Sequence, residues 1–202
     1  MTSVPPAPAV ATARPGFFAW WHDGTPDAKR ALVAAGLGWM LDAFDVMLYA
    51  LLLTSIIADL GITRQTAGAI GSVTLLAAAA GGLFFGVVAD RYGRTRALMA
   101  SVIIYSVFTA ACGFATTALQ LAVFRILLGI GMGGEWARGA ALVSETWPAE
   151  HRGKALGLMQ SAWAIGYLLA AAVTMILLPR WGWRVVFFMG VLPAFLTLWV
   201  RR

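Results

Sequence analysis

The chain has 202 residues, of which 60% are hydrophobic and 12% are charged, and its formal net charge is +6. Soluble domains carry roughly 25% charged residues, so this composition excludes an ordinary soluble domain and predicts lipid as the solvent. The positive charge does not indicate nucleic acid as a partner, because the Lys and Arg residues lie in short gaps between long apolar runs. Cys112 is the single cysteine, which excludes a disulfide within the chain and a metal site built from several cysteines.

Residues 1–24 are rich in Pro and Ala and then in aromatic residues. They contain no short apolar run followed by a cleavage site, so they do not form a signal peptide. We predict a disordered cytoplasmic tail that ends in an aromatic patch at the membrane interface. Thr25-Pro26-Asp27 then has the form of a helix start, with an N-cap, a proline and an acidic residue in the first turn.

Residues 25–202 are predicted to form a membrane domain of six apolar helices, since a bilayer core takes about 20 residues per helix. The predicted spans are about 31–57, 66–89, 97–115, 118–144, 155–178 and 185–200. Thr117 to Gln120 has the form of a capping box at the start of the fourth span. Trp147-Pro148 closes that span, and Pro179 ends the fifth. The fold class is therefore an all-α membrane bundle of six transmembrane helices.

Basic residues predict the orientation of these helices. With the N-terminus inside, the inner segments hold Arg14, Lys29, Arg30, Arg91, Arg94, Arg96, Arg152, Lys154, Arg201 and Arg202, and the outer segments hold Arg64, Arg180 and Arg184. The excess on the inner side follows the positive-inside rule for short loops. We expect a multi-pass protein of the plasma (cell inner) membrane with both termini in the cytoplasm.

Small residues recur at the spacing that lets helices approach closely in lipid. They are Ala78, Gly82 and Gly86 in the second span, Gly129 and Gly133 in the fourth, and Ala162 and Gly166 in the fifth. Residues 129–134 also fit the dinucleotide pattern G-x-G-x-x-G, but no strand precedes them, so we interpret these glycines as packing residues.

The chain has no P-loop and no nucleophile–base set or metal-ligand cluster that would predict an enzyme, a cofactor or a bound metal. His22 and His151 lie in polar segments and are expected to be solvated.

Two spans carry ionisable residues deep in their apolar runs, where a charge is costly and indicates function. Asp42 and Asp45 lie three residues apart on one face of the first span, with Tyr49 one turn beyond. The fourth span carries Arg125, Glu135 and Arg138. Glu135 and Arg138 are also three residues apart, a spacing at which they can pair on one face of the helix.

These six residues are our candidates for proton and substrate handling. Two acids on one buried face repel one another, and binding a proton removes the repulsion, as a proton-coupled carrier requires. Arg125 can hold a substrate carboxylate. The alternative is structural, with aspartate and arginine neutralising one another across the bundle.

The turn between the second and third spans resembles the signature of the Major Facilitator Superfamily, G-x-x-x-D-R-x-G-R-[RK]-x. It reads from Gly86 through Asp90, Arg91, Gly93 and Arg94 to Arg96, and it departs from the pattern at Thr95. Gly86 would permit a close helix contact, Gly93 a sharp turn, and the arginines would pair with acids such as Glu145.

Three further stretches resemble the same family and extend the likeness over about 25–202. They are residues 125–134, the segment from Glu145 through Pro148 to Arg152, and the Trp-Gly-Trp-Arg run at 181–184. The resemblance implies two inverted three-helix repeats, here forming the N-terminal half of a twelve-helix carrier that works by alternating access. It also implies a cytoplasmic gate at the signature turn.

Three details are most similar to proton symporters of organic acids, such as sialate and aromatic or short-chain acids. They are the run from Asp42 to Asp45, Gly134-Glu135, and the Trp-Gly-Trp-Arg run at 181–184. The implied partners are membrane lipid, a small organic anion, protons, and either the missing C-terminal six-helix half or a second copy of the chain. A sugar uptake or efflux carrier of the same superfamily and a truncated fragment without transport activity are the alternatives.

Overall fold

The structure is a computed structural model that describes residues 19–191, and within them all side chains except those of residues 19, 94, 95, 98 and 135–138. Every regular element in this range is a helix, so the all-α prediction is confirmed. The helices are α1 (Ala19–Asp23), α2 (Pro26–Leu60), α3 (Arg64–Tyr92), α4 (Arg94–Cys112), α5 (Ala118–Thr146) and α6 (Arg152–Met189).

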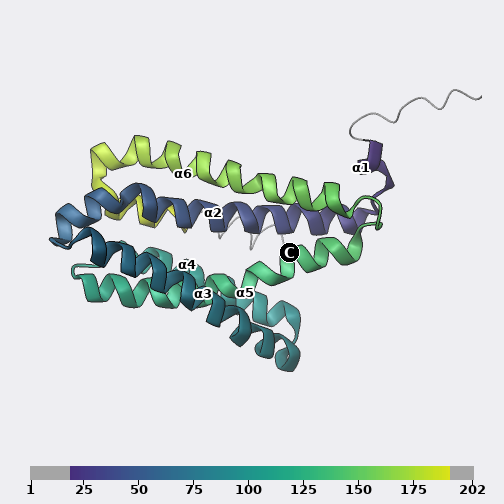
Figure 1. Ribbon diagram of the computed structural model, residues 1–202, viewed down its shortest axis with the longest axis horizontal. Helices are drawn as coiled ribbons and strands as arrows, with labels where there is room; N and C mark the ends of the chain where they lie inside the picture. Colours follow the sequence, from purple (N-terminus) through teal and green to yellow (C-terminus); the bar gives the residue numbers. More distant parts are fainter. Residues whose placement is uncertain (1–18, 192–202) are drawn as a thin grey trace, which may run out of the picture.

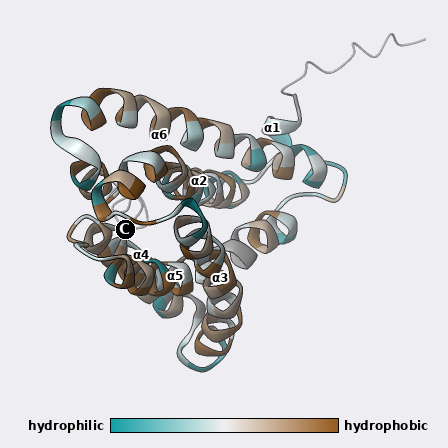
Figure 2. Cartoon of the chain, turned by 60° about the vertical axis from the view of Figure 1, so that its left-hand side comes forward, coloured by the Kyte–Doolittle hydropathy of each residue, from teal (hydrophilic) through white to brown (hydrophobic). Residues whose placement is uncertain are grey.

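By length and composition, α2, α3, α5 and α6 can each cross a membrane, and α4 contains a shorter apolar stretch over Met99–Cys112. Apolar residues run along the helices, and hydrophilic residues gather at the connecting turns (Figure 2).

Side-chain caps begin two of the long helices where the sequence predicts them. Thr25 is the N-cap of α2, its hydroxyl accepts a hydrogen bond from the Ala28 amide at 3.1 Å, and Pro26 opens the helix. Thr117 caps α5 in the same way by accepting from the Gln120 amide at 3.2 Å. The Gln120 side chain accepts from the Thr116 amide at 2.9 Å and so completes the capping box one residue further back than the usual pattern.

The break between the fifth and sixth predicted spans lies at Gly182 and not at Pro179, which corrects the sequence prediction. α6 continues through Pro179, and its backbone leaves helical geometry at Gly182, with φ 77 and ψ 173. A proline removes one helical hydrogen bond and bends a helix without having to end it. A positive φ is open to glycine at little steric cost, so the chain turns at Gly182.

The helices form two groups that meet through α2 and α5. α2 packs along α6, and α5 packs on both α3 and α4 (Figure 1). The first helix of each predicted repeat, α2 or α5, therefore packs against the second helix of the other repeat. This exchange of partners is the arrangement expected of two interlocked three-helix repeats.

Glycines on α5 allow its close approach to α3 and α4. A methyl group on Gly133 would collide with the Ala78 carbonyl oxygen of α3, and one on Gly131 would lie 2.6 Å from the Tyr105 backbone nitrogen of α4. Helices in lipid associate through such backbone contacts. The predicted close contact at Gly86 is not made by any described residue, since a methyl group there would meet no heavy atom within 4 Å.

We expect Gly133→Ala to destabilise the bundle by about 1–3 kcal/mol, because the added methyl group meets backbone atoms that cannot rotate away. Gly157→Ala in α6 is the matched control. A methyl group at Gly157 meets nothing within 4 Å, so this change should be neutral or gain up to about 1 kcal/mol from helix propensity. Thermal unfolding of the two variants in detergent makes the comparison, and equal melting temperatures would contradict the packing role of Gly133.

Candidate functional site

A buried ion pair joins α2 to α5 at the middle of the bundle. Arg125 Nη1 lies 3.4 Å from Asp45 Oδ2, and the two side chains are 3% and 1% exposed. The Thr109 hydroxyl of α4 donates a further hydrogen bond to Asp45 Oδ1 at 3.2 Å. The carboxylate is thus held by one cation and one neutral donor from two different helices.

Tyr49 lies over Arg125 and fixes its position. The guanidinium carbon is 4.2 Å from the centre of the Tyr49 ring, a cation–π contact. The Tyr49 hydroxyl donates to the Ala67 carbonyl of α3 at 2.7 Å, which holds the ring in place. The structure therefore brings Asp45, Tyr49 and Arg125 together as one cluster.

Asp42 is buried on α2 one turn before Asp45, with 1% of its surface exposed. The two acids share one face of α2, as their spacing predicts. Glu135 and Arg138 are the remaining candidates within the spans, and their side chains lie outside the described residues.

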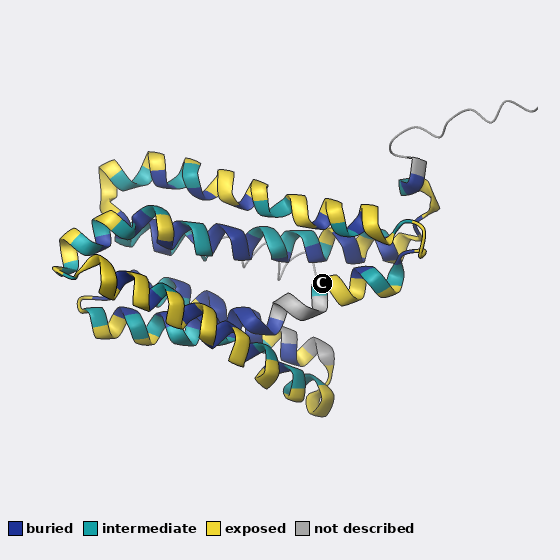
Figure 3. Cartoon of the chain, viewed as in Figure 1, coloured by how far each residue is buried: buried dark blue, intermediate teal, exposed yellow. Residues whose placement is uncertain are grey.

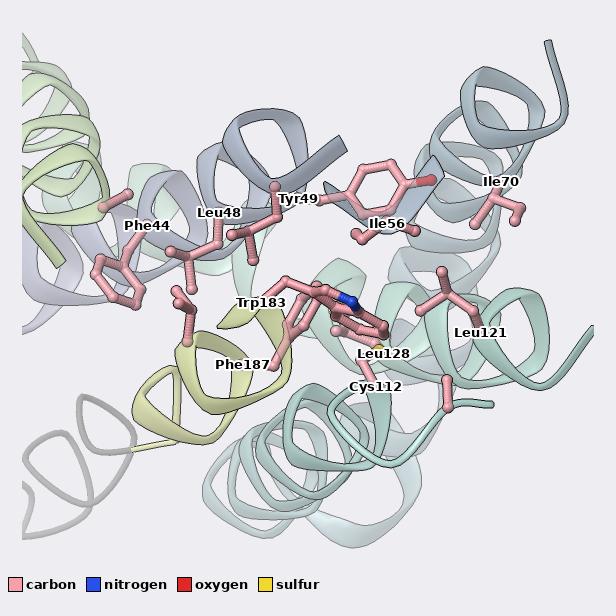
Figure 4. Packing of buried hydrophobic residues seen from close by; sticks show 14 of the residues in the cluster. Phe44, Leu48, Tyr49, Ile56, Ile70, Cys112, Leu121, Leu128, Trp183 and Phe187 are labelled. Atoms are coloured by element: carbon pink, nitrogen blue, oxygen red, sulfur yellow. The ribbon is translucent and has the colours of Figure 1, made fainter. Parts of the chain in front are cut away.

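An apolar core lies beside the ion pair and meets it through Tyr49, whose ring contacts Arg125. It includes Leu48 and Tyr49 of α2, Leu128 of α5 and Trp183 and Phe187 of α6 (Figure 4). Among the described side chains, α2 carries the longest run of buried residues, at 41–45, whereas α6 exposes much of its outer face (Figure 3). Charges in such surroundings are costly to leave unpaired. Any step that changes the charge of Asp45 must therefore be balanced by a second charge.

Arg125 has unused binding capacity. Its Nε atom is buried and has no hydrogen-bond partner among the described residues. A guanidinium carries five N–H donors in a planar fork that matches a carboxylate. The arrangement can hold Asp45 and still offer donors to an anion.

The signature turn is at the surface. Asp90, Arg91 and Arg96 are exposed, and Gly93, with φ 91, links the end of α3 to the start of α4. Glu145 is also exposed, and among the described residues it forms no ion pair with Arg91. The Arg94 side chain lies outside the described residues.

Arg152 lies apart from this turn, at the start of α6, where its Nε donates to the Trp147 carbonyl at 3.1 Å.

A second polar cluster, which was not predicted from the sequence, lies at the end of the bundle where α2 finishes. Arg184 Nη1 lies 2.7 Å from Asp59 Oδ2, and Trp183 Nε1 donates to the same oxygen at 3.2 Å. Arg184 also donates to the Ala115 carbonyl at 3.2 Å. Asp59 is the one acidic residue in the predicted loop between the first two spans. A single acid in this loop is the feature of the sequence that could have predicted an ion pair here.

We expect Asp59→Ala to lower the free energy of unfolding by about 1–2 kcal/mol, because it removes both the ion pair and the acceptor for Trp183. Asp59→Asn should cost less, since the amide oxygen can still accept from the indole. Melting temperatures of the two variants in detergent measure the difference. Equal losses would contradict the hydrogen bond to Trp183 as a stabilising contact.

At the opposite end, α1 docks on the turn between α5 and α6. Trp20 is buried against Trp147, with ring centres 5.0 Å apart, and the Trp147 indole donates to the Ala28 carbonyl at 3.0 Å. His151 Nε2 lies 3.0 Å from Asp23 Oδ2.

The His151 side chain is only 14% exposed. The expectation that it is solvated is therefore wrong, because α1 covers it. His22 is exposed as expected.

Comparison with known proteins finds relatives of this chain that are named as transporters. The sequence profile of the Major Facilitator Superfamily matches residues 35–202. The chain is 41% identical over 189 residues to a probable 4-methylmuconolactone transporter of Cupriavidus pinatubonensis, which covers 92% of this chain and 44% of that protein.

Two further relatives are similar over most of this chain. It is 41% identical over 184 residues to the sialic acid transporter NanX of Escherichia coli, covering 91% of this chain and 45% of that protein. It is 40% identical over 163 residues to the niacin transporter NiaP of Acinetobacter baylyi, covering 81% of this chain and 37% of that protein. The chain thus spans less than half the length of these relatives.

The fold matches the inward-open xylose transporter XylE from E. coli with a TM-score of 0.72 at 21% identity. The match covers 85% of this chain and 46% of that chain. At this level of identity the likeness supports the fold alone.

Proposed function

Since the chain belongs to the Major Facilitator Superfamily, as its match over residues 35–202 shows, we propose that it is half of a proton-coupled symporter of an organic anion. Three of its relatives are transporters, and two of them are named for the carboxylic acids sialic acid and niacin. The chain is an integral membrane protein, and we place it in the plasma membrane with both termini in the cytoplasm, following its basic residues.

The observation that carries this proposal is the buried pair of Asp45 and Arg125, at 3.4 Å. The pair is neutral when Asp45 is ionised. Binding a proton to Asp45 leaves Arg125 as an unbalanced buried cation, which is costly in an apolar core. A substrate carboxylate restores neutrality, so one proton and one monovalent anion stabilise each other's binding.

The neighbouring residues have separate roles in this scheme. Thr109 can donate to the carboxylate of Asp45 or accept from its protonated form, since a hydroxyl does both. Tyr49 keeps the guanidinium beside the site in both charge states. Asp42, one turn away, is a second place for the proton.

Alternating access then requires a second six-helix half to complete the cavity, supplied by the rest of the protein or by a second copy of the chain. Transporters of this architecture bind their cargo between the halves and rock one half against the other. The signature turn, with Gly86 through Arg96, Glu145 and Arg152, is the proposed cytoplasmic gate. Glu135 and Arg138 are proposed to handle substrate or protons from α5.

Uptake by cells that express the complete protein tests the proposal. Radiolabelled niacin, benzoate and sialic acid are offered at about pH 6 and about pH 8, roughly one unit on either side of neutral. We expect faster uptake of at least one acid at the lower pH and loss of its accumulation when a protonophore is added. Accumulation that the protonophore leaves intact would exclude proton coupling.

A further inference from the structure

The Tyr49 side chain links α2 to two other helices. Its ring lies between the Arg125 guanidinium of α5, 4.2 Å from the ring centre, and Gly71 of α3, where an added methyl group would lie 3.3 Å from the ring. Its hydroxyl donates to the Ala67 carbonyl of α3 at 2.7 Å. The ring points from α2 toward the segment of α3 that carries Ile70 (Figure 4). One side chain thus contacts the proposed anion-binding residue and the start of α3 at once.

The hydrogen bond from Tyr49 joins two helices that otherwise pack little on each other. α2 packs mainly along α6 and on α5, and it meets α3 at few places. α3 instead packs closely on α5, since a methyl group on Gly129 of α5 would collide with the Thr74 carbonyl oxygen of α3. α3 and α5 therefore act as one unit, and the Tyr49 hydroxyl ties α2 to this unit through Ala67.

We propose that Tyr49 is a positioning residue that couples anion binding at Arg125 to a movement of α3 against α2. In the empty site, the positive charge of Arg125 attracts the ring, and the ring places the hydroxyl against Ala67. A carboxylate bound to Arg125 offsets that charge, so the attraction on the ring weakens and the hydroxyl leaves Ala67. The inference rests on the proposed function, because it requires the anion to bind at Arg125.

Release of this hydrogen bond has its largest effect at the far end of α3. From Ala67 to its last residue, Tyr92, α3 extends about 38 Å at 1.5 Å per residue. Its end leads into the signature turn, which is the proposed cytoplasmic gate. A small rotation about the start of α3 therefore becomes a larger displacement at the gate.

The anion affinity of Tyr49→Phe in the complete protein tests the coupling. The variant keeps the ring on Arg125 and loses the hydrogen bond, while the Ala67 carbonyl keeps its bond within the helix. Because anion binding no longer has to break the bond to Ala67, we expect the anion to bind about two- to tenfold more tightly, the equivalent of one hydrogen bond. A merely structural role of Tyr49 would leave the affinity unchanged or lower it. Calorimetric titration in lipid nanodiscs with benzoate, niacin and sialic acid, at the acidic pH of the uptake test, measures the affinities.

Thr74→Val is the matched control. It also removes one buried hydroxyl that donates to a carbonyl of α3, here that of Ile70 at 2.8 Å, but this bond lies within α3. The control should keep the wild-type anion affinity. Equal or weaker anion binding by Tyr49→Phe than by the wild-type protein, or an equal gain in the control, would overturn the coupling and leave the proposed symport standing. Failure of all three acids to bind the wild-type protein would instead overturn both.

A distance measurement follows the movement itself. Spin labels are attached at Arg30 of α2 and Leu83 of α3, whose side chains are exposed, and the buried Cys112 stays unlabelled. In the wild-type protein, adding the anion should change the distance between the two labels. In Tyr49→Phe the distance should already be changed before the anion is added. A wild-type distance that the anion leaves unaltered, or an empty variant with the distance of the empty wild-type protein, would overturn the inference.

Discussion

Asp45→Asn is expected to make anion binding independent of pH. In the wild-type protein each anion binds together with a proton, so the anion affinity should fall about tenfold per pH unit over the range in which the site takes up its proton. The asparagine amide resembles a protonated carboxyl in shape and charge. Arg125 is then a permanent cation in the apolar core, and it accepts an anion without a proton. Proton uptake on adding the anion should therefore fall to background.

Asp27→Asn is the matched control, because it makes the same chemical change on the same helix. Asp27 is 88% exposed, and among the described residues its ion pair is with Arg30, at 3.8 Å. In the control, the anion affinity should change with pH as it does in the wild-type protein. Titrating the anion at several pH values measures this dependence. If the anion affinity of Asp45→Asn still depended on pH as in the wild-type protein, another group would carry the proton, with Asp42 as the first candidate.

Arg125→Gln is expected to have the largest effect on stability of any single change in the site. It leaves Asp45 as a buried carboxylate with no cation among its described partners, and breaking a buried pair in this way costs roughly 3–5 kcal/mol. The double variant Asp45→Asn/Arg125→Gln removes both charges. It should recover most of the loss, because two amides can hydrogen-bond at the same place.

A double-mutant cycle of melting temperatures and of unfolding in denaturing detergent measures the coupling between the two residues. Additive effects would contradict a direct ion pair. Anion binding gives an independent readout: Arg125→Gln and the double variant should both lose it, whereas Asp45→Asn should keep it.

The fold was largely predictable from the sequence because its strongest determinants are local. Long apolar runs, the caps at Thr25 and Thr117 and the end of α5 at Trp147 each act within a few residues. The helix ends were less predictable. α2 reaches Leu60 and α3 begins at Arg64, since helices continue past the apolar core into polar turns.

Gly182 illustrates a break that local rules do not locate. Proline is the stronger local signal, yet α6 passes through Pro179 and turns three residues later. The turn places Trp183 and Arg184 beside Asp59, so tertiary contacts with the end of α2 favour it. Contacts between residues 124 positions apart leave no local pattern in the sequence.

The residues of the candidate site also differ in whether the sequence predicts them. Asp42, Asp45 and Arg125 stand out in the sequence because charges are rare in apolar runs. Thr109 does not, since a hydroxyl inside a helix usually bonds to its own backbone, and Thr109 also makes such a bond, to the Tyr105 carbonyl at 3.0 Å. That it meets Asp45 follows from tertiary packing, because α4 packs on α5 and the Thr109 and Tyr105 hydroxyls reach from there to α2.

Electrical neutrality of transport is the most direct test of the account. The complete protein in liposomes is given a monocarboxylate such as benzoate or niacin, while anion uptake, internal pH and membrane current are recorded together. If the proton on Asp45 balances the anion on Arg125, one proton enters with each anion, a pH gradient drives uptake, and no current flows. Uptake that carries a current or ignores the pH gradient would contradict the exchange of charge between Asp45 and Arg125.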